Sequence, residues 1–264
     1  MNKDIQKRYL HMLEFTQKVE EFLLNIQSKK NFWIDKKGQT DLVTEADIGS
    51  EAMLTKEIRE QFPEDSILGE EKGSYEGSGK YKWILDPLDG TTNFSHGLPL
   101  FGVSIGLENR ETGKIDLGIV ATPVFKETYH AVRGNGAFKN KKKILVSNKA
   151  QLIESLICTG FPYDLKDRID SIIIKYKNML LKSRGIRRTG TATLDLCWIA
   201  EGRFDGFWEE NLKPWDMAGP SVIIEEAGGT ITDFLGNTFN PYVPNVIASN
   251  GFLHQEIIEI ISSC

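Results

Sequence analysis

Residues 86–93 read DPLDGTTN and directly follow the apolar run YKWIL, which predicts a buried strand that ends in a rigid turn. Asp86 and Asp89 place two carboxylates in that turn. Gly90 lacks the side chain that would keep an anion away from backbone amides, and the Thr91 hydroxyl follows at once. These groups could bind cations and a phosphate and could orient a water nucleophile, so the motif predicts metal-dependent phosphate chemistry.

Further acids fall beside predicted strand or helix ends, at Glu70-Glu71 and at Asp216. If they converge with the two aspartates of the first motif, they cannot all stay ionised without cations. Carboxylate oxygens favour Mg²⁺ or Mn²⁺ over zinc. Asp86 could bridge two ions about 4 Å apart, with the Leu88 carbonyl as a neutral ligand. The alternative for the short motif alone is a surface turn that binds no metal.

The segment TEAD begins at Thr44 and permits two interpretations. In one, Thr44 caps a helix and Asp47 is its acidic partner. In the other, Asp47 orients the Thr91 hydroxyl, which with Glu70 would polarise a water molecule. Both can hold at once, because a carboxylate has several acceptor positions.

Several other polar residues also have two interpretations. Gly190-Thr191-Ala192 could present free amides at a helix start or be a plain helix start. Glu209 and Glu210 could accept hydrogen bonds from ligand hydroxyls or be solvated. The pair Lys36-Lys37 could attract phosphate or lie on the surface, and the arginines at 184, 187 and 188 could shape a pocket or a subunit contact.

The elements that must position these residues differ between the two halves of the chain. The first half predicts helices over 3–28 and from Thr44 to before Pro63, then strands with short turns that suggest an antiparallel sheet. These strands cover 66–69, 81–85, 101–107, 115–121, 128–132, 137–138 and 144–146, with a surface loop over 73–80. The second half predicts an α/β pattern. Its strands cover 156–159, 204–208, 230–233 and 246–249, and its helices cover 168–181, 191–201, 215–227 and 253–261.

Composition bounds the function. The 264 residues are 40% hydrophobic and 26% charged, which is ordinary for a soluble protein, and the net charge of −5 argues against a nucleic-acid binder. The three cysteines match no zinc pattern and fit reduced cytosol, so we expect a cytoplasmic protein. We expect no secretory signal and no membrane segment. We also expect two packed lobes, residues 1–148 and 149–264, that form one unit.

Five ordered blocks of the chain resemble the inositol monophosphatase family. Residues 83–94 (WILDPLDGTTNF) are similar to its first signature, and residues 215–218 (WDMA) with 226–229 (EAGG) are similar to its second. Residues 41–47 (DLVTEAD), 68–71 (LGEE) and 190–192 (GTA) match three further family blocks. The resemblance implies the αβαβα layered sandwich of the fructose-1,6-bisphosphatase-like, Mg²⁺-dependent and Li⁺-sensitive phosphatases, an α+β fold with an antiparallel-sheet lobe followed by an α/β lobe.

The resemblance also implies roles for residues of this chain. Glu70, Asp86 and the Leu88 carbonyl would hold one Mg²⁺, and Asp86, Asp89 and Asp216 would hold a second, with a third ion or Mn²⁺ possible. Catalysis would use Glu70 and Thr91, supported by Asp47, and Lys36 would lie near the metals. The substrate-binding residues would be Leu88, Asp89, Gly90, Thr91, Gly190, Thr191, Ala192, Glu209 and Asp216.

One departure from the family pattern concerns the second signature. Where the family usually has Ala-Ala-Gly, this chain has Ala218-Gly219-Pro220. We expect a helix that starts near Asp216, so that Pro220 falls at the margin of its first turn, where proline is tolerated.

The resemblance favours hydrolysis of inositol 1-phosphate by a metal-activated water, in a homodimer. Fructose 1,6-bisphosphate, NADP(H), histidinol phosphate and nucleoside bisphosphates are alternative substrates within the superfamily. The partner would be a small phosphorylated metabolite, with neither nucleic acid nor membrane. Two rival interpretations are a protein-interaction module, since some bacterial relatives bind the transcription machinery, and a sugar-phosphate binder without turnover.

Overall fold

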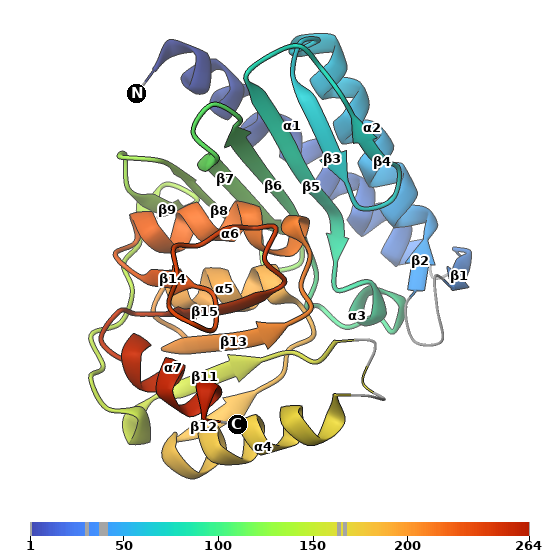
Figure 1. Cartoon of the computed structure of the whole chain (residues 1–264). Coiled ribbons are helices and arrows are strands. Elements are labelled where there is room, and N and C mark those ends of the chain that lie inside the picture. The colour runs from blue at the N-terminus through green and yellow to red at the C-terminus, as the bar shows by residue number, and fades with distance from the viewer. Residues whose placement is uncertain (1, 30–31, 37–41, 163–164, 166–167, 264) are drawn as a thin grey trace.

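The computed structural model describes every residue except 1, 30–31, 37–41, 163–164, 166–167 and 264. Its layers alternate in the order helices, sheet, helices, sheet, helices (Figure 1). Helices α1 and α2 cover the outer face of an eight-stranded sheet, α5 and α6 lie between the two sheets, and α4 and α7 cover a five-stranded sheet. The αβαβα sandwich predicted from the sequence is therefore confirmed.

The first half of the chain supplies the outer helices and the larger sheet. Its elements are α1 (Lys3–Lys29), β1 (Ile34–Lys36), β2 (Leu42–Thr44), α2 (Glu45–Gln61), β3 (Ser66–Gly69), β4 (Gly73–Tyr75), β5 (Tyr81–Asp89), α3 (Thr91–Ser95), β6 (Gly102–Asn109), β7 (Lys114–Thr122), β8 (Glu127–Val132), β9 (Ala137–Lys139) and β10 (Lys142–Lys143).

The second half supplies the remaining layers. Its elements are a 3₁₀ turn (Leu152–Glu154), β11 (Leu156–Thr159), α4 (Ile169–Lys182), β12 (Gly185–Arg187), α5 (Ala192–Ala200), β13 (Gly206–Glu210), α6 (Pro214–Glu226), β14 (Thr230–Thr232), β15 (Asn245–Ser249) and α7 (His254–Ser262).

The strand order of the larger sheet is β10-β9-β8-β7-β6-β5-β3-β4. It is antiparallel, as predicted, except that β3 and β5 run parallel. The chain returns along the outer edge of the sheet as β4, antiparallel to β3, before β5 begins on the other side of β3. Two local predictions are wrong, since residues 73–80 contain strand β4 instead of only a loop and residues 144–146 form no strand. The elements without a predicted counterpart are β1, β2, α3, β10 and β12.

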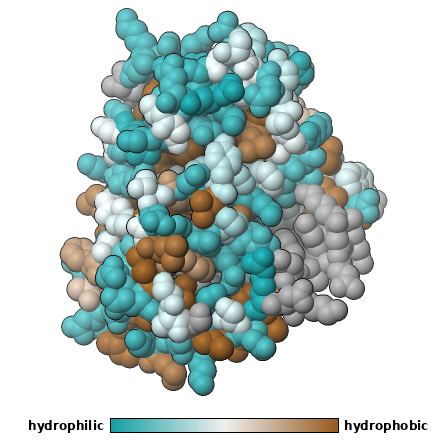
Figure 2. Space-filling model, viewed as in Figure 1, coloured by the Kyte–Doolittle hydropathy of each residue, from teal (hydrophilic) through white to brown (hydrophobic). Residues whose placement is uncertain are grey.

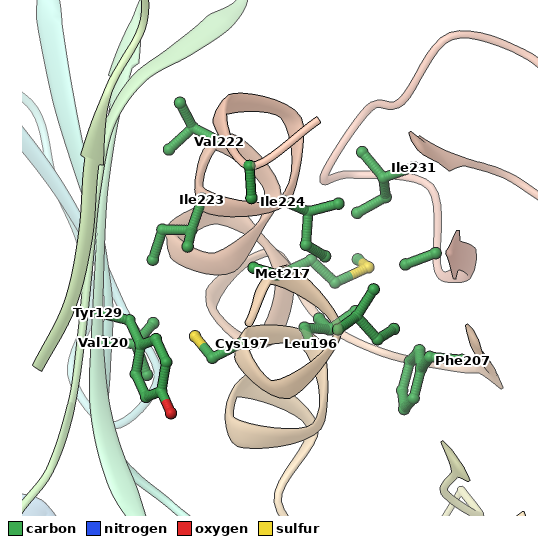
Figure 3. Close-up of a cluster of buried hydrophobic side chains, with 14 of the residues drawn as sticks. Val120, Tyr129, Leu196, Cys197, Phe207, Met217, Val222, Ile223, Ile224 and Ile231 are labelled. Carbon is green, nitrogen blue, oxygen red and sulfur yellow. The ribbon is translucent and has the colours of Figure 1, made fainter. Parts of the chain in front are cut away.

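The central core forms where α5 and α6 meet both sheets. Figure 3 shows Cys197 of α5 directed toward Tyr129 and Val120 of the larger sheet, while Leu196 lies on the side of Phe207 in β13. Residues from both predicted lobes thus share one hydrophobic cluster. The boundary between residues 148 and 149 stays a prediction.

Helix α6 lies unusually close to the larger sheet. A Cβ atom added at Gly118 of β7 would come within 2.0 Å of the Gly219 carbonyl oxygen, and one added at Gly106 of β6 would come within 2.7 Å of the Ala218 Cβ atom. Such distances exclude any larger residue without movement of the backbone. The glycines therefore set how near α6, which carries Asp216, stands to the strand bearing Asp86.

The expected position of Pro220 is wrong. Helix α6 begins at Pro214, and its N-cap Lys213 donates its backbone N–H to Asp216 Oδ2 at 2.7 Å. Pro220 is therefore in the helix interior, where it has no N–H to donate to the carbonyl of Asp216, four residues before it. Pro214 was the start signal, because proline suits the first helical position.

The surface view shows hydrophilic residues over most of the α1–α2 side and apolar residues gathered toward the α4–α7 side (Figure 2). The exposed apolar residues of α4 are Ile169, Ile173, Ile174, Leu180 and Leu181. Within the described residues, no helix combines the length and the apolar character needed to cross a bilayer.

Candidate active site

A cavity of about 270 Å³ collects the acids that the sequence predicts to converge. They come from the turn after β3, the end of β5 and the start of α6. The cavity is lined by Glu70, Asp86, Leu88, Asp89, Gly90, Thr91, Phe161, Pro162, Glu209, Asn211, Leu212, Lys213, Trp215 and Asp216. A larger hollow of about 880 Å³ between α1, β1 and α3 has no acidic residue among its described lining residues.

A bulge in β5 separates the two aspartates of the central motif. Asp86 pairs with Ser104 of β6 and Asp89 pairs with Gly102, so the register shifts by one residue between them. Pro87 and Leu88 occupy this bulge, and the Leu88 N–H donates to Asp86 Oδ1 at 3.1 Å. In a regular strand, residues three positions apart point to opposite faces of the sheet. A bulge changes the direction of the side chains that follow it. Asp86 and Asp89 consequently both line the cavity.

Asp47 both caps α2 and bonds the Thr91 hydroxyl, while its part in polarising a water molecule stays a prediction. Asp47 Oδ2 accepts from the backbone N–H and the hydroxyl of Thr44, which completes the cap of α2. Asp47 Oδ1 accepts from the Thr91 hydroxyl at 2.8 Å, and the Leu88 carbonyl lies 3.0 Å from the same hydroxyl. A hydroxyl has one proton, so when it donates to Asp47 the Thr91 oxygen can still accept a hydrogen bond, and Thr91 lines the cavity.

Gly90 joins β5 to α3 in a conformation that other residues avoid. Its φ is +88°, and an added Cβ atom would come within 2.8 Å of both the Leu100 carbonyl and the Thr191 hydroxyl oxygen. The position therefore requires glycine on two independent grounds.

The start of α5 binds Asp89. The backbone N–H and the hydroxyl of Thr193 donate to Asp89 Oδ2 at 2.8 and 2.6 Å. This bond links residues far apart in sequence and satisfies an amide that the helix itself leaves unpaired. The amides expected to be open at this helix start thus face a carboxylate. The predicted segment Gly190-Thr191-Ala192 lines an adjoining hollow of about 100 Å³.

That adjoining hollow contains further acids. Glu209, Asp195 and Asp89 line it together with Arg188, whose position beside the cavity the sequence left open. Burial, and then the charge of Asp216, raise the pKa of Glu209 well above its usual value. Gly160 provides the room for Glu209, since an added Cβ atom would come within 2.1 Å of its carboxylate.

The other predicted residues lie elsewhere. Glu210 pairs with Lys175 of α4 at 3.1 Å and with Arg168 at 3.6 Å, so it is neither solvated alone nor directed to the cavity. Lys37 and Asp41 lie outside the described residues, and Lys36 is described only as the last residue of β1.

Burial and mutual repulsion raise the pKa values of Asp86, Asp89 and Asp216. Burial raises the pKa of Asp86 well above its usual value, and the charges of Glu70, Asp89 and Asp216 add to the rise. Burial followed by the charge of Asp89 raises the pKa of Asp216 to about 7, and a hydrogen bond with Asp86 opposes this rise. Burial raises the pKa of Asp89 to about 6, against the hydrogen bonds from Thr193. Two carboxyl groups that bond each other share a proton, which is how close acids avoid mutual repulsion.

The donor set fits a hard divalent cation. Several buried carboxylates and a backbone carbonyl supply only oxygen, and their mutual repulsion is what a divalent cation would relieve. In the described part of the chain, no three Asp, Glu, His or Cys side chains are already arranged around a common ion position. Metal binding would therefore need some of these side chains to reorient around the ion.

A pH dependence of stability follows. Asp216 and Asp89 keep protons in the folded protein that the unfolded chain releases near pH 4, so their contribution is lost as pH rises through about 6 to 7. We expect the Tm in EDTA to fall between about pH 5 and 8, and Mg²⁺ to raise the Tm more at pH 8, because metal competes with protons. Scanning calorimetry checks both slopes. A Tm increase from Mg²⁺ that is equal at pH 6 and 8 would contradict this assignment.

Sequence reasoning missed several residues that hold the site together. Asn93 lies inside the central motif, and its side-chain N–H groups donate to the carbonyls of Leu100 and Thr189. Thr193 follows the predicted GTA segment directly. Asn93 and Thr193 each belong to a predicted motif or lie next to one, and this position is the signal that could have identified them. Their hydrogen-bond partners are distant in sequence.

The family model for inositol monophosphatases matches residues 5–264. The chain is 41% identical over 209 residues to the Nus factor SuhB of Pseudomonas aeruginosa, covering 77% of this chain and 76% of that protein. It is 36% identical over 233 residues to an inositol-1-monophosphatase of Mesorhizobium japonicum, covering 88% and 87%. The solved inositol monophosphatase of Anabaena has a TM-score of 0.89 at 33% identity, covering 99% of this chain and 97% of the other. The chain belongs to the inositol monophosphatase family.

Proposed function

We propose that this protein hydrolyses a small phosphate monoester in a Mg²⁺-dependent reaction, most simply inositol 1-phosphate to inositol and phosphate. The observation that carries the proposal is the gathering of Glu70, Asp86, Asp89 and Asp216 in one cavity with the Thr91–Asp47 pair. A binding protein without turnover would have no use for a hydroxyl held as an acceptor toward the cavity. The family membership supports the same class of reaction.

Two groups of residues would hold the ions. Glu70, Asp86 and the Leu88 carbonyl form the first, and Asp86, Asp89 and Asp216 form the second. Mg²⁺ bound there lowers the pKa of a water molecule and neutralises charge on the phosphate and the leaving oxygen. Mn²⁺ has the same preference for oxygen ligands and would substitute. The hydrogen bonds from Thr193 to Asp89 would hold its carboxylate in a fixed orientation beside an ion.

Thr91 and Glu70 would position the attacking water and take its proton. Donation of the Thr91 proton to Asp47 fixes the direction in which the Thr91 oxygen can accept a hydrogen bond. Glu70 supplies the base, since it lines the same cavity. Asp47 acts through Thr91 and also holds the start of α2.

The substrate would lie across both hollows. Its phosphate would meet the backbone amides of Gly90 and Thr91 next to Leu88, Asp89 and Asp216, and its alcohol would meet Gly190, Thr191, Ala192 and Glu209. The two hollows, about 270 and 100 Å³, adjoin and share Asp89, Glu209 and Asp216, so one small phosphate monoester could lie across both. Inositol 1-phosphate is the first candidate, and fructose 1,6-bisphosphate, histidinol phosphate, NADP(H) and a nucleoside bisphosphate are the alternatives.

A phosphate-release assay over these five substrate types, with Mg²⁺, with Mn²⁺ and with EDTA, tests the proposal. We expect release from inositol 1-phosphate that requires the metal, and inhibition by high Li⁺, as the resemblance implies. Metal-dependent release from a different monoester only would change the substrate and keep the reaction. No release from any of them would reject the proposal.

A second candidate function is an interaction with the transcription machinery. It is favoured by the name Nus factor, which the relative from P. aeruginosa carries. The similarity to a Nus factor weakens the expectation that this protein has no nucleic-acid partner. A pull-down with purified RNA polymerase components, with bound protein quantified, tests it. Stoichiometric capture together with absence of phosphate release would make this function the primary one.

The oligomeric state and the cellular location are further proposals. A homodimer is what the resemblance implies, and light scattering at several protein concentrations tests it. A cytoplasmic location is consistent with Cys158 and Cys197, which are both buried free thiols.

A further inference from the structure

Helix α2 carries three polar side chains that are almost completely buried. Asp47, Ser50 and Glu51 have exposed fractions of 1%, 0% and 1%. Their spacing of three and four residues places them on one face of the helix. Polar groups in such positions cost stability unless each is hydrogen-bonded, so their partners are informative.

Each of these side chains holds a different part of the active-site cavity. Asp47 accepts from the Thr91 hydroxyl at 2.8 Å. Ser50 donates to the Pro87 carbonyl at 2.8 Å, inside the bulge between Asp86 and Leu88. Glu51 does not line the cavity, and its contacts lie behind Glu70.

Glu51 accepts hydrogen bonds from two successive backbone amides. The N–H of Glu71 donates to Oε2 and the N–H of Lys72 donates to Oε1, both at 2.7 Å. Consecutive amides that converge on one anion are an established way to compensate a buried negative charge. The fit is close, since a Cβ atom added at Gly69 would come within 2.7 Å of the Glu51 carboxylate.

These bonds fix the turn that carries Glu70. Strands β3 and β4 pair so that Gly69 lies opposite Gly73, which leaves a three-residue hairpin of Glu70, Glu71 and Lys72. Gly73 closes it with a φ of +75°, as such hairpins require. Because the amides of the last two residues are directed to α2, the orientation of the peptide that follows Glu70 is set from behind the cavity.

We propose that Glu51 is a positioning residue, which holds the β3–β4 turn so that the Glu70 carboxylate faces the cavity in the orientation that a divalent cation needs. The inference rests on the proposed function, because it assigns Glu70 to the metal. Residues that orient metal ligands typically change metal affinity about 10–100-fold when they are replaced. In Glu51→Gln, only the side-chain oxygen can accept a hydrogen bond, so only one of the two backbone N–H groups keeps its acceptor. The side-chain NH₂ group would face the other backbone N–H.

The test measures Mn²⁺ binding without substrate, from the electron paramagnetic resonance signal of free Mn²⁺, at a temperature where circular dichroism shows folded protein. We expect Glu51→Gln to weaken binding at least about tenfold. Added to Glu70→Gln, it should weaken binding no further, because it acts only through Glu70. If Glu51→Gln does not fold, Gly69→Ala displaces the same carboxylate without changing a charge, and it should weaken binding in the same direction.

Glu60→Gln is the matched control, since it removes the same charge from the same helix at a side chain that is 56% exposed. It should bind Mn²⁺ as the wild type does. Three results would overturn the inference while leaving the proposed function in place. They are wild-type Mn²⁺ affinity in Glu51→Gln, a full additional loss of affinity in the double variant, and an equal loss of affinity in Glu60→Gln. A wild-type protein that neither binds Mn²⁺ nor releases phosphate would overturn both.

Discussion

Replacing Asp86 by Asn is expected to reduce Mg²⁺-dependent phosphate release about 10³-fold, because the proposed ligand common to both ions contributes on the order of 4 kcal/mol of charge stabilisation. The fold should be kept. Asn has the shape and the hydrogen-bonding groups of a protonated Asp, so it can still accept from the Leu88 N–H and donate to Asp216. Steady-state assays at saturating Mg²⁺, with calorimetry of the same samples in EDTA, measure both effects.

The stability of this variant separates a metal ligand from a structural acid. Removal of one charge from a cluster of mutually repelling acids should leave the Tm in EDTA at about pH 8 unchanged or higher. Asp170→Asn, at an exposed position in the first turn of α4, removes the same charge far from the cavity and should keep full activity. Near-normal activity of Asp86→Asn would remove Asp86 from the metal site.

Replacing Thr91 by Val is expected to reduce kcat about 10²-fold, the lower end of what positioned acid–base groups contribute. Val keeps the volume and the branching of Thr but removes the hydroxyl that would accept from the attacking water. Mn²⁺ affinity should change little, because Thr91 is not among the proposed metal ligands. Parallel measurement of kcat and of Mn²⁺ binding therefore distinguishes loss of water positioning from loss of metal.

The neighbouring residue provides the control for this substitution. Thr92 is exposed and in the same short helix α3, so Thr92→Val makes an identical chemical change one residue away. It should retain wild-type kcat. If Thr91→Val also retains it, the Thr91–Asp47 pair has only the structural role of joining α2 to α3.

Local patterns predicted much of the fold and the chemistry. The apolar stripe of α1, the Thr44–Asp47 cap and the strand before Asp86 depend on neighbours within a few residues, and the structure agrees with each of them. The carboxylates gather because each ends or begins a regular element that leads to one side of the larger sheet. Recognition of family motifs gave the layer order, which periodicity alone does not contain.

Contacts between distant segments could not be predicted. The bond from Thr193 to Asp89 and the anchoring of the Glu70 turn by Glu51 depend on how the layers pack. The same applies to Gly118, whose need for glycine is evident only from its contact with Gly219. The start of α6 was misjudged although its signals are local, namely Pro214 at the first helical position and the capping bond between Lys213 and Asp216.

The most direct test of the account is a crystal structure of the protein with Mn²⁺ at about pH 8, above the pKa values of Asp216 and Asp89. The anomalous signal of manganese locates the ions without reference to any family. The account predicts one ion between Glu70 and Asp86 and one between Asp89 and Asp216, with Asp86 touching both. Manganese bound elsewhere, with none of these four carboxylates in contact with an ion, would contradict it.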